Sequence, residues 1–203
     1  MEWPFCYYGN RKVTVSIWTL SMNRESMRGG RSKETMPRFE KYIDLAKSLH
    51  MVDARLISSE DIFFDIRAIL KCRWGCEDFF KGSIKCHTRD TSFQDRVDMV
   101  KAYETILIVH SHNAQELSRA VLEIEKQAFL DGFYLSFAIR YCKLCETCAV
   151  DYGNACPTPK RVRPCDQSFG IDVYKTAGNL GLPCEVLQSG EDIQNRYGFV
   201  LIE

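Results

Sequence analysis

The feature that most constrains this chain is a run of cysteines in "RYCKLCETCAVDYGNACP", residues 140–157. Cys142, Cys145 and Cys148 are separated from one another by two residues, and Cys156 follows after seven more and precedes a proline. Thiols spaced this closely meet around one tight loop. We therefore expect this segment to fold as a loop around a shared centre.

A second set of cysteines lies upstream in "KCRWGCEDFFKGSIKCHT". Cys72, Cys76 and Cys86 are one thiol short of a four-cysteine site, and Cys156, Cys165 or Cys184 is a candidate to complete either set. Nine cysteines lie between Cys72 and Cys184, so eight fill two such sites and leave one over. Cys6, isolated near the start of the sequence, is expected to be a free thiol without a role. The candidate ligands are Cys142, Cys145, Cys148, Cys156, Cys72, Cys76, Cys86 and Cys165.

Composition narrows the use of these thiols to metal binding or redox chemistry. Ten cysteines are many for an intracellular chain of 203 residues, yet a chain this long buries a core without disulfides. The apolar stretch at residues 13–22 lacks the features of a secretory signal, so we expect a reducing, cytoplasmic location. The 27 basic and 27 acidic side chains give no charge that would favour nucleic acid. No apolar run approaches the roughly 18 residues of a membrane span.

The spacing favours iron–sulfur chemistry over zinc. A C-x2-C-x2-C run followed by C-P is typical of bacterial ferredoxins, whose [4Fe–4S] clusters take one thiolate for each iron. Structural zinc more often uses two separated C-x2-C pairs. We therefore predict one or two [4Fe–4S] clusters, with zinc as the alternative. The gap of seven residues before Cys156 leaves open which site this cysteine completes.

Apolar periodicity predicts a compact α+β domain over residues 36–203 with cysteine-rich loops. Residues 1–35 form an N-terminal extension with a possible strand at 13–17, or lie upstream of a natural start at Met36. Helical patterns cover residues 37–49, 91–104, 113–132 and 168–181, with Asn113 and Glu116 as a capping pair. Extended segments are expected at 53–57, 62–70, 105–110, 184–188 and 198–203, and 133–140 is a strand or a buried helix.

Aromatic and histidine residues near these segments allow two readings each. Trp74, Phe79, Phe80, Tyr141 and Tyr152 flank the cysteines and either form a dry shell around a cluster or are ordinary core. The "HSH" at 110–112 either binds metal or, as we favour, forms a polar strand-to-helix turn. His87 is a minor candidate for a missing ligand.

Three functions are compatible with these residues. The leading hypothesis is electron transfer to a partner oxidoreductase. The second is a zinc-stabilised interaction module without redox activity. The third is an enzyme whose cluster keeps one open iron, for which the Cys72, Cys76 and Cys86 set is the candidate. Whether the protein is an enzyme stays open, because no nucleotide, hydrolase or zinc-protease motif occurs.

From about Met36 onward the chain resembles an uncharacterised family of predicted metal-binding proteins, a domain of unknown function. The resemblance rests on "LKCRWGCEDFFKGSIKC", "CKLCETCAVDYGNACPTPKRVRP" and "GIDVYKTAGNLGLP". It implies cysteine-bound metal, with iron–sulfur as the expected form, but no reaction. The family usually has Cys-Pro-Pro at the third cysteine, whereas this chain has Cys86-His87-Thr88.

Overall fold

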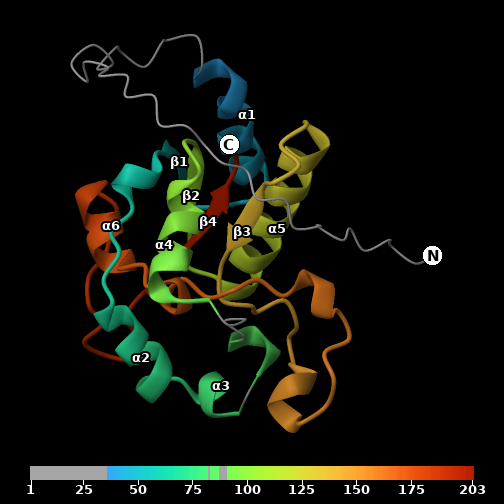
Figure 1. The fold of residues 1–203 in the computed structure, drawn as a ribbon, viewed down its shortest axis with the longest axis vertical. Coiled ribbons are helices and arrows are strands. Elements are labelled where there is room, and N and C mark those ends of the chain that lie inside the picture. Colours follow the sequence, from blue (N-terminus) through green and yellow to red (C-terminus); the bar gives the residue numbers. More distant parts are fainter. Residues whose placement is uncertain (1–35, 82, 87–90) are drawn as a thin grey trace, which may run out of the picture. The chain divides into compact units, whose positions relative to one another are not determined.

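The protein forms an α+β domain around one antiparallel sheet in the computed structural model, which describes residues 36–81, 83–86 and 91–203 (Figure 1). The sheet has the order β1-β2-β4-β3. Its strands are β1 (Asp53–Ile57), β2 (Ile106–Ser111), β3 (Phe137–Ile139) and β4 (Arg196–Leu201). The predicted fold class is confirmed. The predicted extension at 1–35, with Cys6 and the strand at 13–17, lies outside the described residues.

Helices cover both faces of the sheet, which is why β2 is buried at all six positions and apolar at its first four. Leu107 and Val109 face the side covered by α1 (Met36–Ser48) and α5 (Ala114–Leu130). Ile106 and Ile108 face the opposite side, where α4 (Phe93–Lys101) and α6 (Val173–Asn179) contribute Val100 and Ala177. Alternate side chains of one strand thus enter two separate cores.

The predicted helix at 113–132 is confirmed as α5, and local signals set its ends. The Asn113 side chain accepts hydrogen bonds from the backbone N–H groups of Gln115 and Glu116, at 2.9 and 3.1 Å. Asn113 therefore satisfies two of the donors that a helix start leaves free. Gly132 follows the helix with a φ of +100°, a conformation that favours glycine.

The extended segment predicted at 62–70 is wrong in its second half. Helix α2 (Arg67–Gly75) begins there, and the Asp65 carboxylate accepts a hydrogen bond from the Arg67 backbone N–H at 2.8 Å. Ile66 and Leu70 are 61% and 56% exposed, so these apolar side chains do not mark a buried strand. As a result Cys72 is carried on a helix.

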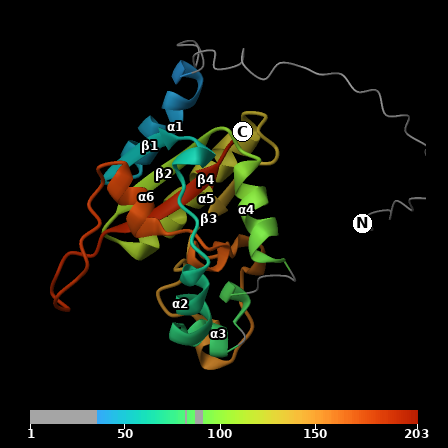
Figure 2. The same ribbon diagram turned by 60° about the vertical axis from the view of Figure 1, so that its left-hand side comes forward.

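The strand predicted at 184–188 is also wrong. This segment is an exposed part of the loop drawn in red that projects from the body in Figure 2. The Asp192 carboxylate accepts hydrogen bonds from the backbone N–H groups of Gln188 and Ser189, at 2.6 and 2.9 Å. A local turn thus satisfies donors that a strand would offer to a neighbour. The last predicted strand is confirmed as β4, and β3 lies within 133–140.

The cysteine-bearing segments gather at one end of the domain. Figures 1 and 2 both show α2, α3 (Glu77–Phe80) and the orange segment around residues 141–164 together, beyond the ends of the strands. Among the described helices, none has the length and apolar character needed to cross a membrane.

Candidate metal centre

Four cysteines meet within the segment that follows β3. The Cys142 thiol interacts electrostatically with Cys148, Cys156 and Cys145, and all four line one small cavity. The segment 142–156 contains one 3-10 turn, Ala149–Tyr152, and no other regular structure, so the predicted loop is present. Burial raises the pKa of Cys142. We call these four residues the 142–156 group.

Three further cysteines meet between α2 and the turn Ile84–Cys86. Cys72 lies on α2 and is 4% exposed, Cys76 joins α2 to α3, and Cys86 ends the turn. The sulfurs of Cys76 and Cys86 and a carboxylate oxygen of Asp78 all lie within 4.8 Å of one another. Burial, reinforced by Cys76, Asp78 and Cys72, raises the pKa of Cys86 to about 12.

Cys165 joins this second set from a distant part of the chain. Its thiol is buried and interacts electrostatically with Cys72, because the segment around Gln167–Phe169 packs against α2. Cys72, Cys76, Cys86 and Cys165 are called the 72–165 group below. Cys184 lies elsewhere, beside Gly178 of α6 and in electrostatic contact with Tyr197.

An ion-paired lysine connects the two groups. Lys85 is 4% exposed, and its Nζ lies 2.8 Å from the Oδ1 atoms of both Asp78 and Asp151. Asp78 lies among the thiols of the 72–165 group, whereas Asp151 belongs to the loop of the 142–156 group. Burial opposes the charge of Lys85, but the hydrogen bonds to Asp151 and Asp78 outweigh it and raise the pKa of this lysine. Nothing in the sequence distinguishes this lysine from its solvated neighbours.

The aromatic residues near the cysteines do not form the dry shell that was one interpretation. Trp74, Phe80 and Tyr152 are 73%, 69% and 73% exposed. The ring of Tyr141 instead lies 5.6 Å from Nζ of Lys85. Both interpretations, the dry shell and ordinary core packing, are therefore wrong for Trp74, Phe80 and Tyr152.

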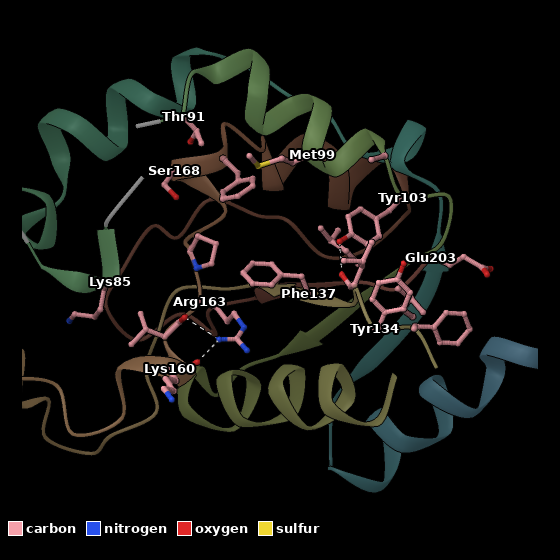
Figure 3. A pocket seen from close by; sticks show the side chains of 18 of the residues that line it. Lys85, Thr91, Met99, Tyr103, Tyr134, Phe137, Lys160, Arg163, Ser168 and Glu203 are labelled. Carbon is pink, nitrogen blue, oxygen red and sulfur yellow. Dashed lines mark hydrogen bonds between the residues drawn. The ribbon is translucent and has the colours of Figure 1, made fainter. Parts of the chain in front are cut away.

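A large apolar cavity of about 1010 Å³ adjoins the small cavity that the 142–156 group lines, and the two cavities share Ile84, Lys85 and Val162 (Figure 3). Arg163 lies at one end, where its guanidinium donates to the Glu125 carboxylate at 2.5 and 2.7 Å. At the other end the Tyr103 hydroxyl donates to the Leu135 carbonyl at 2.6 Å. These polar groups are satisfied by the protein itself.

The histidines lie away from both cysteine groups in the part of the chain that the structure describes. His110 is buried in β2, stacks on Tyr197 and has Nε2 2.9 Å from the Asn195 side-chain oxygen. Burial lowers the pKa of His110. His112 directly precedes the cap residue Asn113, as the turn interpretation predicts. His87 lies outside the described residues.

The donor set fits a thiolate-bound metal. Each group contains four cysteines, and four thiolates are the ligand set of a [4Fe–4S] cluster or of a structural zinc ion. Among the described residues, the donor atoms that already lie within 4.8 Å of one another are those of Cys76, Cys86 and Asp78. The buried cation Arg96 also interacts with Cys72, where it offsets negative charge on the sulfur. This guanidinium is held by the backbone carbonyls of Ser92, Thr91 and Ser168.

Comparison with known proteins gives one match. Neither the curated proteins nor the solved structures contain a match. A family model described as "Predicted metal-binding protein (DUF2284)" matches residues 55–202, a range that includes all eight candidate cysteines. The chain therefore belongs to this uncharacterised family of predicted metal-binding proteins.

Proposed function

We propose that this protein binds two [4Fe–4S] clusters, one in each cysteine group, and transfers electrons to a partner oxidoreductase. The observation that carries the proposal is the electrostatic interaction of Cys165 with Cys72, which supports two sets of four thiols. The C-x2-C-x2-C run of the 142–156 group favours iron–sulfur over zinc. When bound, such clusters accept and release single electrons.

The surrounding side chains would prepare the thiols for metal. Burial raises the pKa of Cys72, which favours the protonated thiol, and a bound metal would take the place of that proton. Arg96 favours the thiolate form of Cys72 through its charge. Lys85 supplies a second buried cation between the groups. Both cations would offset the negative charge of thiolate-bound iron.

Exposed aromatic side chains support a protein partner. Trp74 on α2, Phe80 on α3 and Tyr152 in the 142–156 segment expose most of their surface beside the cysteines. Exposed aromatic residues are enriched at protein interfaces. Docking there would bring a redox partner close to a cluster. The predicted cytoplasmic location suits oxygen-sensitive clusters.

Metal analysis of protein purified without oxygen tests the proposal. We expect about eight iron and eight acid-labile sulfide per chain, with visible absorption and an EPR signal after reduction. Cys142→Ser and Cys165→Ser should each lower the iron content to about half, because each removes a ligand from one cluster. Cys184→Ser is the matched control and should leave the iron content unchanged. Zinc as the sole metal would overturn the proposal in favour of a zinc-stabilised module.

A further inference from the structure

A second cavity of about 580 Å³ lies beyond the start of β4 and is formed by α2, residues 166–174 and the 184–196 loop. It shares none of its lining residues with the cavity of Figure 3. Three arginines line it: Arg67 on α2, Arg140 directly after β3, and Arg196, the first residue of β4. Arg140 is only 8% exposed.

Arg140 and Arg196 each keep one buried donor atom without a hydrogen-bond partner in the described chain. The Nε atoms of Arg140 and Arg196 are both buried, and neither has a hydrogen-bond partner among the described residues. A buried cationic donor without a partner costs free energy, so such atoms are rare in folded proteins. Arg67 on the same wall differs, because its guanidinium donates to the Asp65 carboxylate at 2.5 Å.

The carboxylates around the cavity do not neutralise the charges of both Arg140 and Arg196. Asp166 attracts Arg140 electrostatically, whereas Arg196 and Arg140 repel each other. The Asp172 side chain instead accepts a hydrogen bond from the Lys175 backbone, and Glu185 accepts one from Asn195. Of the four carboxylates that line the cavity, Asp166 is thus the one left for buried Arg140 and half-buried Arg196, and Lys71 adds a further cation at the wall.

The fold makes room for Arg140 through a glycine. Because Ile139 pairs with Phe199, Arg140 lies next to Gly198 of β4. A Cβ at Gly198 would stand 3.3 Å from Cδ of Arg140 and 2.9 Å from Cγ1 of Val121. A side chain at residue 198 would therefore force Val121 and Arg140 to shift.

We propose that Arg140 and Arg196 bind the oxyanion group, a carboxylate or a phosphate, of a small organic molecule in this cavity. Guanidiniums bind such groups through paired, charge-assisted hydrogen bonds, which would satisfy both free Nε atoms. The volume lies in the range of small-molecule sites and exceeds what an inorganic ion fills. Tyr174, Ile171 and Tyr197 supply apolar walls for an organic body.

The anion would lie beside the 72–165 group, because Arg140 also interacts with Cys165. The site therefore suits a substrate or an effector of that centre. It is built from arginines and not from metal ligands, so the inference does not depend on which metal the cysteines hold.

Calorimetric titration of the metal-loaded full chain, purified without oxygen, tests the inference. The probes are phenyl phosphate, phenylacetate and inorganic phosphate, with benzyl alcohol as the uncharged control. We expect saturable binding of at least one aromatic anion below about 10 mM, tighter than that of inorganic phosphate, and no binding of benzyl alcohol. Absence of saturation by both aromatic anions would overturn the inference, as would equal binding of benzyl alcohol.

Variants locate the binding. Arg140→Gln and Arg196→Gln should each weaken binding at least tenfold, because each removes a charge and a bidentate donor. Arg67→Gln, on the same wall but already paired with Asp65, should bind within about twofold of the unchanged protein. If Arg140→Gln does not fold, binding by the variant of the half-buried Arg196, Arg196→Gln, tests the inference instead. Unchanged binding in Arg196→Gln, or metal loss without any anion effect, would mean that the arginines serve the cysteine centre alone.

Discussion

Lys85 and Asp151 form an ion pair with 2.8 Å between Nζ and Oδ1, although 66 residues separate them in the chain. The same Nζ contacts Asp78, which is buried. We expect Lys85→Met to lower the free energy of unfolding by about 3–5 kcal/mol, because it leaves a buried carboxylate uncompensated. Urea unfolding of the metal-loaded protein measures this loss.

The control for that variant is Lys81→Met. Lys81 pairs with Glu77 one helical turn away, and both side chains are exposed. Its loss should cost no more than about 0.5 kcal/mol. Equal losses in the free energy of unfolding would show that the buried ion pairs of Lys85 stabilise the protein no more than an exposed pair does.

Removal of metal should loosen the cysteine-bearing segments, whereas the sheet should stay folded. Residues 141–164 have little regular structure, whereas Ile106, Leu107 and Phe199 are completely buried between helices. After chelation we expect amide hydrogen exchange to become fast across 141–164 and to stay slow in β2 and β4. Loss of protection in β2 at the same chelator concentration would contradict this expectation.

Gly170 and Gly181 have similar backbone angles, so substitutions at these two positions distinguish the cost of backbone strain from the cost of a steric clash. Gly170 and Gly181 have φ values of +75° and +67°. A Cβ at Gly170 would stand 2.8 Å from Cδ2 of Phe93 and nearer still to Cε2, whereas a Cβ at Gly181 meets nothing within 4 Å. Gly181→Ala should cost about 1–2 kcal/mol from the backbone alone. Gly170→Ala should cost a further 1–3 kcal/mol or so from overpacking. Thermal unfolding of both variants measures the difference.

Asp131 should give the domain an acid-sensitive contribution to stability. Its carboxylate accepts hydrogen bonds from Lys41 and from the buried hydroxyl of Tyr42, both at 2.8 Å, and the contact with Lys41 lowers the pKa of Asp131. A lowered pKa means that the contribution is present above the unfolded-state pKa, about 3.9, and disappears as pH falls through the lower folded value.

Asp131→Asn should therefore be less stable than the unchanged protein by about 1–2 kcal/mol at pH 7. The difference should shrink as the pH falls below about 4. Urea unfolding at several pH values measures it. Asp44→Asn removes an exposed pair with Lys47 and is the control, for which we expect little change at any pH. A difference that stays constant down to pH 2 would contradict the assignment.

Much of the fold is predictable from the sequence because its signals are local. Asn113 and Gly132 mark the ends of α5, and the branched run 105–110 becomes the buried centre of the sheet. The failures at 62–70 and 184–188 have one cause. Both segments have strand-like composition, but in the fold neither lies beside a strand with which it could pair along its length. Strand pairing depends on residues far away in the sequence, so local composition does not predict it.

The candidate site divides in the same way. The loop around Cys142 follows from spacing alone, whereas spacing leaves the places of Cys156, Cys165 and Cys184 open. What separates them is the packing of the segment after Pro164 against α2, which is a tertiary contact. Lys85 is equally invisible in the sequence, since its burial depends on Asp78 and Asp151 arriving from different segments.

The place of β4 in the sheet sets an order of events during protein synthesis. β4 lies between β2 and β3, so the sheet closes only when this strand is available. All eight cysteines of the two groups precede β4 in the chain, and therefore leave the ribosome first. The 142–156 group is complete once Cys156 emerges, whereas the 72–165 group must wait for Cys165. Newly made chains thus expose these thiols before the sheet can close, and at that stage the thiols are open to oxidation.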